Sequence, residues 1–253
     1  MAVLKDIAIF KPDTTAQDQE YLTPIPFSPF TAMNIAENPT VAASTLILLE
    51  LQNERNFREL DARMGEFLAT IEQMVAAFFE QDPSMAPCAC RAGCHWCCGF
   101  KTLAFPFEIV RIVEYLNAGL PADKRAGLLQ RIEKTHKLTH SLSPKQRVKL
   151  KLFCPLLING ACVAYPVRPM SCRAYLSTDE MACRRGFYNP NNDRVDQSSY
   201  AIGLYACVKA GFEQGFAACN IDSRPGELIG MLHQGFQIPD LSPLWLKGRK
   251  VFK

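Results

Sequence analysis

The chain lacks any apolar run of the roughly 20 residues that a membrane helix needs. Its first ten residues, Met1–Phe10, also lack the long apolar core of a secretory signal peptide. Neither sign of charge is in excess, because 28 Lys and Arg stand against 25 Asp and Glu. A net charge of +3 gives no reason to expect nucleic acid or an anionic membrane as a partner. These absences predict a cytoplasmic protein that binds neither membrane nor nucleic acid.

Motifs of the common enzyme classes are also missing. The sequence has no P-loop, and no Ser-His-Asp set or pair of carboxylates stands out from chance. His136 and His140 are four residues apart on a predicted helix, a spacing that can bind a metal. No Glu joins them in an HExxH arrangement, so solvent-exposed histidines are the simpler interpretation. Whether the protein is an enzyme stays open.

Cysteine, by contrast, is abundant. Nine of the eleven cysteines lie between Cys88 and Cys183, in two groups separated by more than 50 residues. Disulfides are rare in a reducing cytosol, and an odd number of clustered cysteines favours metal ligation. Cys207 and Cys219 lie apart from both groups on predicted helices, and we interpret them as small buried side chains.

Hydrophobic residues recur at three- and four-residue steps over much of the chain, which predicts helices. The predicted helical ranges are 39–81, 107–120, 121–142, 143–152, 198–220 and 225–236. Both cysteine segments, 83–104 and 154–190, contain many Pro and Gly residues and are predicted to be loops, with at most one helical turn in the first. The predicted fold class is therefore mainly α, a single helical domain with two cysteine-rich loops that converge on a metal site.

The chain divides into three predicted parts. Residues 1–37 are rich in Pro, Thr and Phe without a clear period, which predicts an extended N-terminal arm. Residues 38–240 form the helical cysteine-cluster domain, with its motif region at 88–185. Residues 241–253 are predicted to be an extended basic tail that is anchored by Trp245.

The spacing of the first group favours an iron–sulfur cluster over zinc. Thiolates select zinc, iron–sulfur clusters or Cu(I), and structural zinc usually takes paired C-x2-C knuckles. Here the spacings are x3 and x2, and Cys98 directly follows Cys97. Side chains of adjacent residues diverge, so they suit a multi-metal cluster better than one zinc ion. We expect [4Fe–4S] first, with zinc as the alternative cofactor.

Eight cysteines are candidate metal ligands, and three neighbouring side chains are candidate cofactor-binding residues. The cysteines are Cys90, Cys94, Cys97, Cys98, Cys154, Cys162, Cys172 and Cys183, and the neighbours are Tyr165, Arg168 and Arg173. The two arginines are expected to lower thiolate pKa values and to offset cluster charge, with ion pairs to carboxylates as the alternative. His95 is a further possible ligand, although it is expected to point outward beside Trp96.

On these residues the chain resembles the YkgJ-type cysteine-cluster family, which is described as a zinc- or iron-chelating domain. The motif reads Cys90-x3-Cys94-x2-Cys97-Cys98, then Cys154-Pro155-x6-Cys162-x2-Tyr165-x2-Arg168-Pro169-x2-Cys172-Arg173, with Cys183 after it. The pattern is also similar to the cysteine region of flagellin lysine N-methylase. That relative implies an iron–sulfur site in an enzyme that uses S-adenosylmethionine, but this chain has no Gly-rich loop after a strand to cradle that cofactor.

Three functions follow as hypotheses. The first is an iron–sulfur protein that serves electron transfer, sensing or the support of a protein partner. The second is an interaction module that is held together by structural zinc, with two sites sharing the eight thiolates. The third is an S-adenosylmethionine-dependent protein lysine N-methyltransferase. The sequence alone favours the first, because soft thiolate ligands are dense in two loops more than 50 residues apart and their spacing is not that of plain zinc knuckles.

Overall fold

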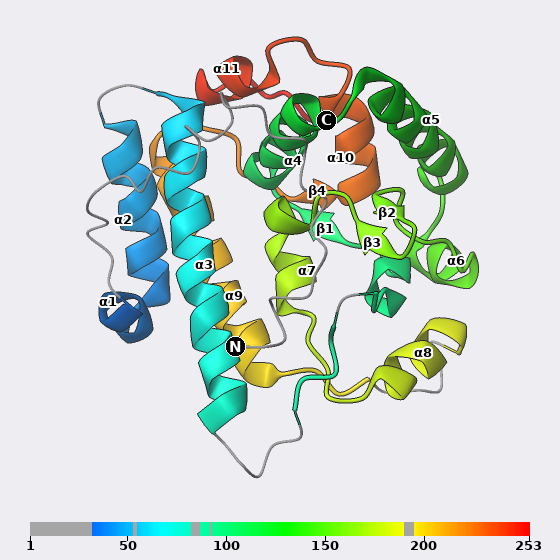
Figure 1. Cartoon of the computed structure of the whole chain (residues 1–253). Coiled ribbons are helices and arrows are strands. Elements are labelled where there is room, and N and C mark those ends of the chain that lie inside the picture. The colour runs from blue at the N-terminus through cyan, green and yellow to red at the C-terminus, as the bar shows by residue number, and fades with distance from the viewer. Residues whose placement is uncertain (1–31, 53–54, 82–86, 92, 190–194) are drawn as a thin grey trace.

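A computed structural model describes residues 32–52, 55–81, 87–91, 93–189 and 195–253 of the chain. The fold is mainly helical, as the sequence predicts (Figure 1). Among the described residues, no helix is both long and apolar enough to cross a membrane. The helices are α1 (Ala32–Glu37), α2 (Pro39–Leu51), α3 (Phe57–Gln81), α4 (Pro106–Gly119), α5 (Ala122–Thr139), α6 (Pro144–Lys149), α7 (Met170–Ala174), α8 (Glu180–Tyr188), α9 (Ser199–Ala218), α10 (Leu228–Gly235) and α11 (Leu241–Leu246), with the short 3₁₀ turns η2 (Trp96–Gly99) and η3 (Tyr165–Val167).

The helical core is built around α2, α3 and α9, which lie side by side (Figure 1). α9 approaches α2 so closely that a Cβ added to Gly211 would lie 2.3 Å from the carbonyl oxygen of Thr40. Only glycine permits that approach. The ring of Phe212 packs 5.7 Å from Phe67 of α3 and 5.6 Å from Phe107 of α4. These aromatic contacts join α4 to the same core.

Two antiparallel strand pairs lie beside the cysteine segments. β1 (Leu103–Ala104) pairs with β4 (Gly226–Glu227), which joins the end of the first cysteine segment to the start of α10. β2 (Leu157–Ile158) pairs with β3 (Ala161–Cys162) in a hairpin inside the second segment. Each strand has only two residues, so these pairs position the segments without forming a sheet of their own.

A buried carboxylate fixes the starts of two helices. Glu108 is 4% exposed. One of its oxygens accepts a hydrogen bond from the backbone N–H of Phe105 at 2.9 Å, just before α4, and the other accepts from Met170 N–H at 2.6 Å, at the start of α7. Burial raises the pKa of Glu108. Because α7 carries Cys172, this carboxylate holds the second cysteine segment against the helical core.

The predicted extended chain is wrong at Ala32–Glu37 of the arm and at Leu241–Leu246 of the tail, whereas residues 249–253 form no helix or strand. Residues 1–31 of the arm lie outside the described residues, but Ala32–Glu37 forms α1, in which Ile35 is fully buried. In the tail, residues 241–246 form α11. The helix buries Leu241, Trp245 and Leu246, and burial of these apolar side chains stabilises it. The anchoring role of Trp245 is confirmed, since its side chain is fully buried and its indole N–H donates to a backbone carbonyl at 2.9 Å.

The prediction of a loop over 154–190 is wrong in two places. α7 carries Cys172 and α8 carries Cys183. Proline at the start of a helix lacks only an N–H that would be unpaired anyway, and Pro169 stands directly before α7. The side chain of Asp179 accepts a hydrogen bond from the first turn of α8 at 2.9 Å, which is an N-cap. Two of the candidate ligands therefore lie on short helices and are held more rigidly than loop residues.

Candidate metal centre

The two cysteine groups lie next to each other, on the side of the molecule that carries η2, the β2–β3 hairpin and α8 (Figure 1). The backbone N–H of Cys154 donates to the carbonyl of Cys98 at 2.8 Å. α8 packs against η2, and the N–H of Ala89 donates to the carbonyl of Ser177 at 2.9 Å. Backbone hydrogen bonds therefore join the first cysteine segment to both ends of the second, and the predicted convergence of the two segments is confirmed.

Cys97 on η2 has the most thiol neighbours. Burial raises the pKa of Cys94, and the negative charge of Cys97 raises it further. Burial and, to a smaller extent, the charge of Cys97 also raise the pKa of Cys162, Cys172 and Cys183. Such an effect falls off with distance. The charge of Cys97 therefore acts on Cys94 in its own segment and on three candidate ligands in the other segment, Cys162, Cys172 and Cys183.

Cys98 has a different set of neighbours. A hydrogen bond between the two adjacent thiols raises the pKa of Cys98 and lowers that of Cys97. Burial and the charges of Cys97, Cys154 and Cys162 raise the pKa of Cys98 further. Burial, and then the charge of Cys162, raises the pKa of Cys154 to about 12. The two adjacent cysteines thus both take part in the same thiol group.

Cys90 lies at the edge of the group. Its Sγ lies 3.9 Å from the carbonyl oxygen of Ser177. A hydrogen bond with Cys90 lowers the pKa of Cys88 to about 6 and raises the pKa of Cys90. Tyr175 lies near Cys90 and near other candidate ligands. Burial raises the pKa of this tyrosine, and the charges of Cys183, Cys97 and Cys90 raise it further. Cys88, which the sequence motif does not require, is therefore Cys90's hydrogen-bond partner.

Electrostatic effects on pKa link the eight predicted ligands pair by pair. They are Cys90, Cys94, Cys97, Cys98, Cys154, Cys162, Cys172 and Cys183, each half-buried or buried, and all eleven cysteines of the chain are free thiols. Among the described residues, no three His, Cys, Asp or Glu side chains are already arranged to hold a metal ion. Metal ligation by these thiols would therefore need side-chain rotation.

The remaining cysteines and histidines test smaller predictions. Cys207 is exposed rather than buried, because it lies on a surface position of α9. His95 stacks on Trp96 with ring centroids 5.0 Å apart, as expected for a side chain beside that ring. His140 is exposed, as predicted. His136 is half-buried, because its ring stacks on that of a histidine of α10 at 4.3 Å, so the prediction of full solvation is wrong there.

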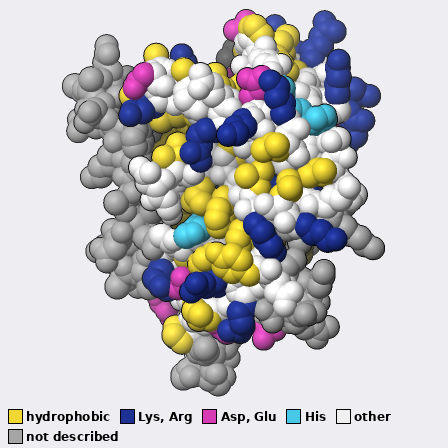
Figure 2. Space-filling view, turned by 90° about the vertical axis from the view of Figure 1, so that its right-hand side faces the viewer, with side chains coloured by type: hydrophobic (Ala, Val, Ile, Leu, Met, Phe, Trp, Pro, Cys, Tyr) yellow, Lys and Arg dark blue, Asp and Glu magenta, His cyan; other side chains and the backbone are white. Residues whose placement is uncertain are grey.

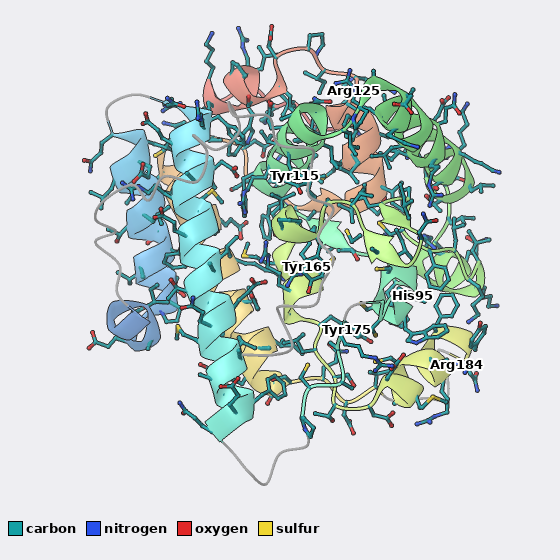
Figure 3. All side chains as sticks on the ribbon, viewed as in Figure 1. His95, Tyr115, Arg125, Tyr165, Tyr175 and Arg184 are labelled. Atoms are coloured by element: carbon teal, nitrogen blue, oxygen red, sulfur yellow. The ribbon has the colours of Figure 1, made fainter. Side chains whose placement is uncertain are left out.

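Arg168 and Arg173 both pair with Glu72 of α3. Their guanidinium nitrogens lie 2.6 and 2.5 Å from the same carboxylate oxygen. The ring centroid of Tyr165, which is labelled in Figure 3, lies 3.9 Å from the guanidinium carbon of Arg168, and Arg168 donates to the carbonyl of Tyr165 at 2.9 Å. Burial raises the pKa of Cys162, and the charge of Arg168 opposes that rise. The alternative of carboxylate pairing is therefore right for both arginines, and Arg168 also acts on a candidate ligand.

Sequence reasoning missed two residues beside the thiols. Glu72 lies in a regular amphipathic helix, and nothing in the local pattern marks it as a partner for two distant arginines. Arg147 is only 3% exposed, and burial lowers its pKa. Its Nε is the one buried side-chain nitrogen or oxygen without a hydrogen-bond partner in the part of the chain that the structure describes. Burial raises the pKa of the Cys154 thiol, and the positive charge of Arg147 lowers it.

This donor set fits a soft metal centre by its chemistry. Thiolates bound to iron or zinc carry negative charge, and a buried site of that kind needs compensating cations and N–H donors nearby. Arg168 acts electrostatically on Cys162, and Arg147 acts on Cys154. The unpaired Nε–H of Arg147 is a donor that such a site would use. Comparison with protein-family models, curated proteins and solved structures finds no match to this chain.

Gly99 lets η2 pack directly on α8. A Cβ added at this residue would lie 2.1 Å from Cε2 of Phe187, a distance at which one segment has to move. We expect Gly99→Ala to separate η2 from α8, to cost about 1–3 kcal/mol of unfolding free energy, and to speed alkylation of the half-buried thiols. Denaturant titration and timed alkylation with mass spectrometry measure both effects.

The matched control is Gly127→Ala on the exposed face of α5, where an added Cβ meets nothing within 4 Å. Alanine in a helix is favoured over glycine, so this variant should gain up to about 1 kcal/mol and leave the alkylation rates unchanged. Equal behaviour of the two variants would show that the packing of η2 on α8 does not hold the thiols in place.

Proposed function

We propose that the protein binds an iron–sulfur cluster, with [4Fe–4S] favoured, and that four of the eight gathered cysteines are its ligands. One observation carries the proposal. Half-buried thiols from two segments more than 50 residues apart lie next to each other. The charge of Arg147 acts on Cys154, and that of Arg168 acts on Cys162. The resemblance of the cysteine motif to a metal-chelating family agrees with this reading.

A cluster is favoured over one zinc ion by the spacing of the donors. Both sites take four ligands, but structural zinc usually takes two C-x2-C knuckles, and the chain has one, Cys94-x2-Cys97. Cys97 and Cys98 are adjacent, yet both have candidate ligands as neighbours. When bound, a [4Fe–4S] cluster supplies one-electron redox chemistry, and its potential depends on net charge and hydrogen bonds to sulfur. Arg147 and Arg168 would adjust both quantities.

The test is anaerobic purification followed by analysis for iron, sulfide and zinc. We expect about four iron and four sulfide per chain and a broad absorption near roughly 400 nm. Cys97→Ala should lower bound iron to a small fraction of that value, because this thiol has the most thiol neighbours.

The matched control is Cys219→Ala, which removes a half-buried thiol at the end of α9 outside the group. It should leave the iron content unchanged. A colourless protein with stoichiometric zinc would contradict the cluster and leave the zinc-bound interaction module as the reading. A metal-free protein in which both variants behave alike would contradict metal binding altogether.

A further inference from the structure

An aromatic cluster joins η2, the start of the second cysteine segment and α8. Trp96, the residue directly before Cys97, stacks on His95 and packs 5.9 and 6.0 Å from the rings of Phe187 and Tyr188 of α8. Phe153, the residue before Cys154, stacks on Phe187 at 4.6 Å. We call these five rings, His95, Trp96, Phe153, Phe187 and Tyr188, the aromatic surface. Its rings are sequence neighbours of candidate ligands in both cysteine segments.

Part of this region is exposed apolar surface. Tyr188 is 59% exposed and Met181, on the same helix, is 53% exposed. Leu150, just before the second cysteine segment, is 44% exposed. Figure 2 shows hydrophobic side chains gathered in the middle of this face, with Lys and Arg side chains around them and few Asp or Glu. Contiguous apolar surface with a polar rim is typical of a protein interaction site.

The segments that carry the aromatic surface have more cations than anions. Residues 143–188 contain eight Lys or Arg and two Asp or Glu, although Arg147 and Arg173 are buried and Arg168 pairs with Glu72. Both acidic residues in this range, Asp179 and Glu180, already pair with arginines. Among the described residues, Lys149 and Arg184 are exposed and show no carboxylate within ion-pair distance. Exposed cations without a carboxylate partner therefore lie on the segments around the aromatic surface.

The ring contacts favour a protein over a nucleic acid as the partner. Single-stranded nucleic acids bind by stacking bases on free aromatic faces. Here Trp96 already has His95 against it and the guanidinium of Arg184 at 5.7 Å from its centroid, and Phe153 and Phe187 stack on each other. His95 and Arg184 are labelled in Figure 3. Tryptophan, tyrosine and arginine are also the residues that carry most binding energy in protein interfaces.

We propose that the aromatic surface and the cations around it form the docking site for an acidic electron-transfer protein that exchanges one electron with the cluster. The proposal rests on the proposed function. Docking brings the partner's redox centre next to η2, which carries Cys97 and Cys98. The partner's reduced centre loses one electron, the oxidised cluster gains it, and no bond is made or broken. Unpaired cations steer an acidic partner to this face at a rate that falls with ionic strength.

A plant-type [2Fe–2S] ferredoxin, an acidic protein of low potential, is the probe. Its reduced form is mixed with the oxidised protein in a stopped-flow instrument at low and high salt. We expect the second-order rate constant to fall about tenfold between these conditions, as screening predicts. Lys149→Glu with Arg184→Glu should lower the low-salt rate constant at least about tenfold, while the spectrum and midpoint potential of the cluster stay unchanged.

The matched control is Lys250→Glu with Lys253→Glu, which changes the net charge equally on exposed residues near the C-terminus, far from α8 (Figure 1). It should keep most of the original rate constant. Equal slowing by both double variants would overturn the docking site, since only net charge would then matter. Salt-dependent binding of a single-stranded oligonucleotide that Arg184→Glu abolishes would also overturn it, in favour of a nucleic-acid partner.

Failure of the proposed function gives a separate signal. If metal analysis finds no iron, electron exchange is excluded, and the docking surface is then measured by calorimetric titration with oxidised ferredoxin at low salt. Binding that the variants of Lys149 and Arg184 remove would keep the surface and overturn only the electron exchange. No binding in an iron-loaded protein would overturn the surface and leave the cluster in place.

Discussion

Removal of the proposed metal is expected to unfold the two cysteine segments, residues 88–100 and 151–188, while the helical core stays folded. The first segment contains only the short turn η2, and the second contains two-residue strands and the short helices α7 and α8, which depend on tertiary contacts. The core formed by α2, α3, α4 and α9 buries large side chains of its own, and residues of the second segment such as Val167 and Met170 pack against it. Metal binding supplies on the order of 10 kcal/mol in small cysteine-ligated sites, which is enough to decide whether such segments stay ordered.

Amide hydrogen exchange of the metal-loaded and chelated protein measures this outcome. Protection in the two cysteine segments should fall at least about 100-fold, and protection in α3 and α9 should change little. The Cys219→Ala variant serves as a control that loads metal normally. Equal loss of protection throughout the chain would mean that the core needs the metal too, and unchanged protection would mean that the segments hold their structure without it.

The second large effect is expected at Glu72. Glu72→Ala leaves the guanidinium groups of Arg168 and Arg173, 16% and 4% exposed, without their carboxylate partner. Breaking a buried ion pair by removing one member costs about 3–5 kcal/mol, because the remaining charge stays desolvated. Since α3 and the second cysteine segment meet at this pair, we expect a loss of that size in the free energy of unfolding, measured by denaturant titration.

An exposed pair gives the control. Glu133 and Lys137 are four residues apart on α5 with side chains 50% and 70% exposed, so Glu133→Ala should leave the free energy of unfolding nearly unchanged. A cost below about 1 kcal/mol for Glu72→Ala would show that solvent reaches the two arginines and that the pair does not bind α3 to the cysteine segment.

The regular helices were predictable from the sequence. Apolar periodicity predicts α3 and α9, and Pro106 marks the first residue of α4. α7 and α8 were missed because prolines and glycines around them suggest a loop. The start signals were present all the same, as Pro169 before α7 and Asp179 before α8. Short helices that begin at such signals need tertiary contacts, here with Glu108, that no local pattern shows.

The candidate site was predictable to the level of residue type. Cysteine spacing predicts eight thiols as ligands, and the structure brings the two segments that carry them together. It did not identify Glu72 or Arg147, because ion pairs and buried donors depend on which distant segments meet. The sequence could not decide whether Arg168 acts on a thiol or pairs with a carboxylate, because that too depends on which segments meet. In the structure Arg168 does both, since burial raises the pKa of Cys162 and the charge of Arg168 lowers it, and since Arg168 also pairs with Glu72.

The contact between α2 and α9 also bears on how the protein is made. Thr40 donates to the carbonyl of Cys207 across 167 positions, so the helical framework closes only after α9 has left the ribosome. At about 5–20 residues per second, the 120 residues between Cys98 and Ala218 take on the order of 6–24 s to synthesise. During that interval the first thiols are present in the nascent chain without their enclosing framework. Delivery of the proposed cluster would therefore follow translation, or a chaperone would cover these thiols until α9 docks.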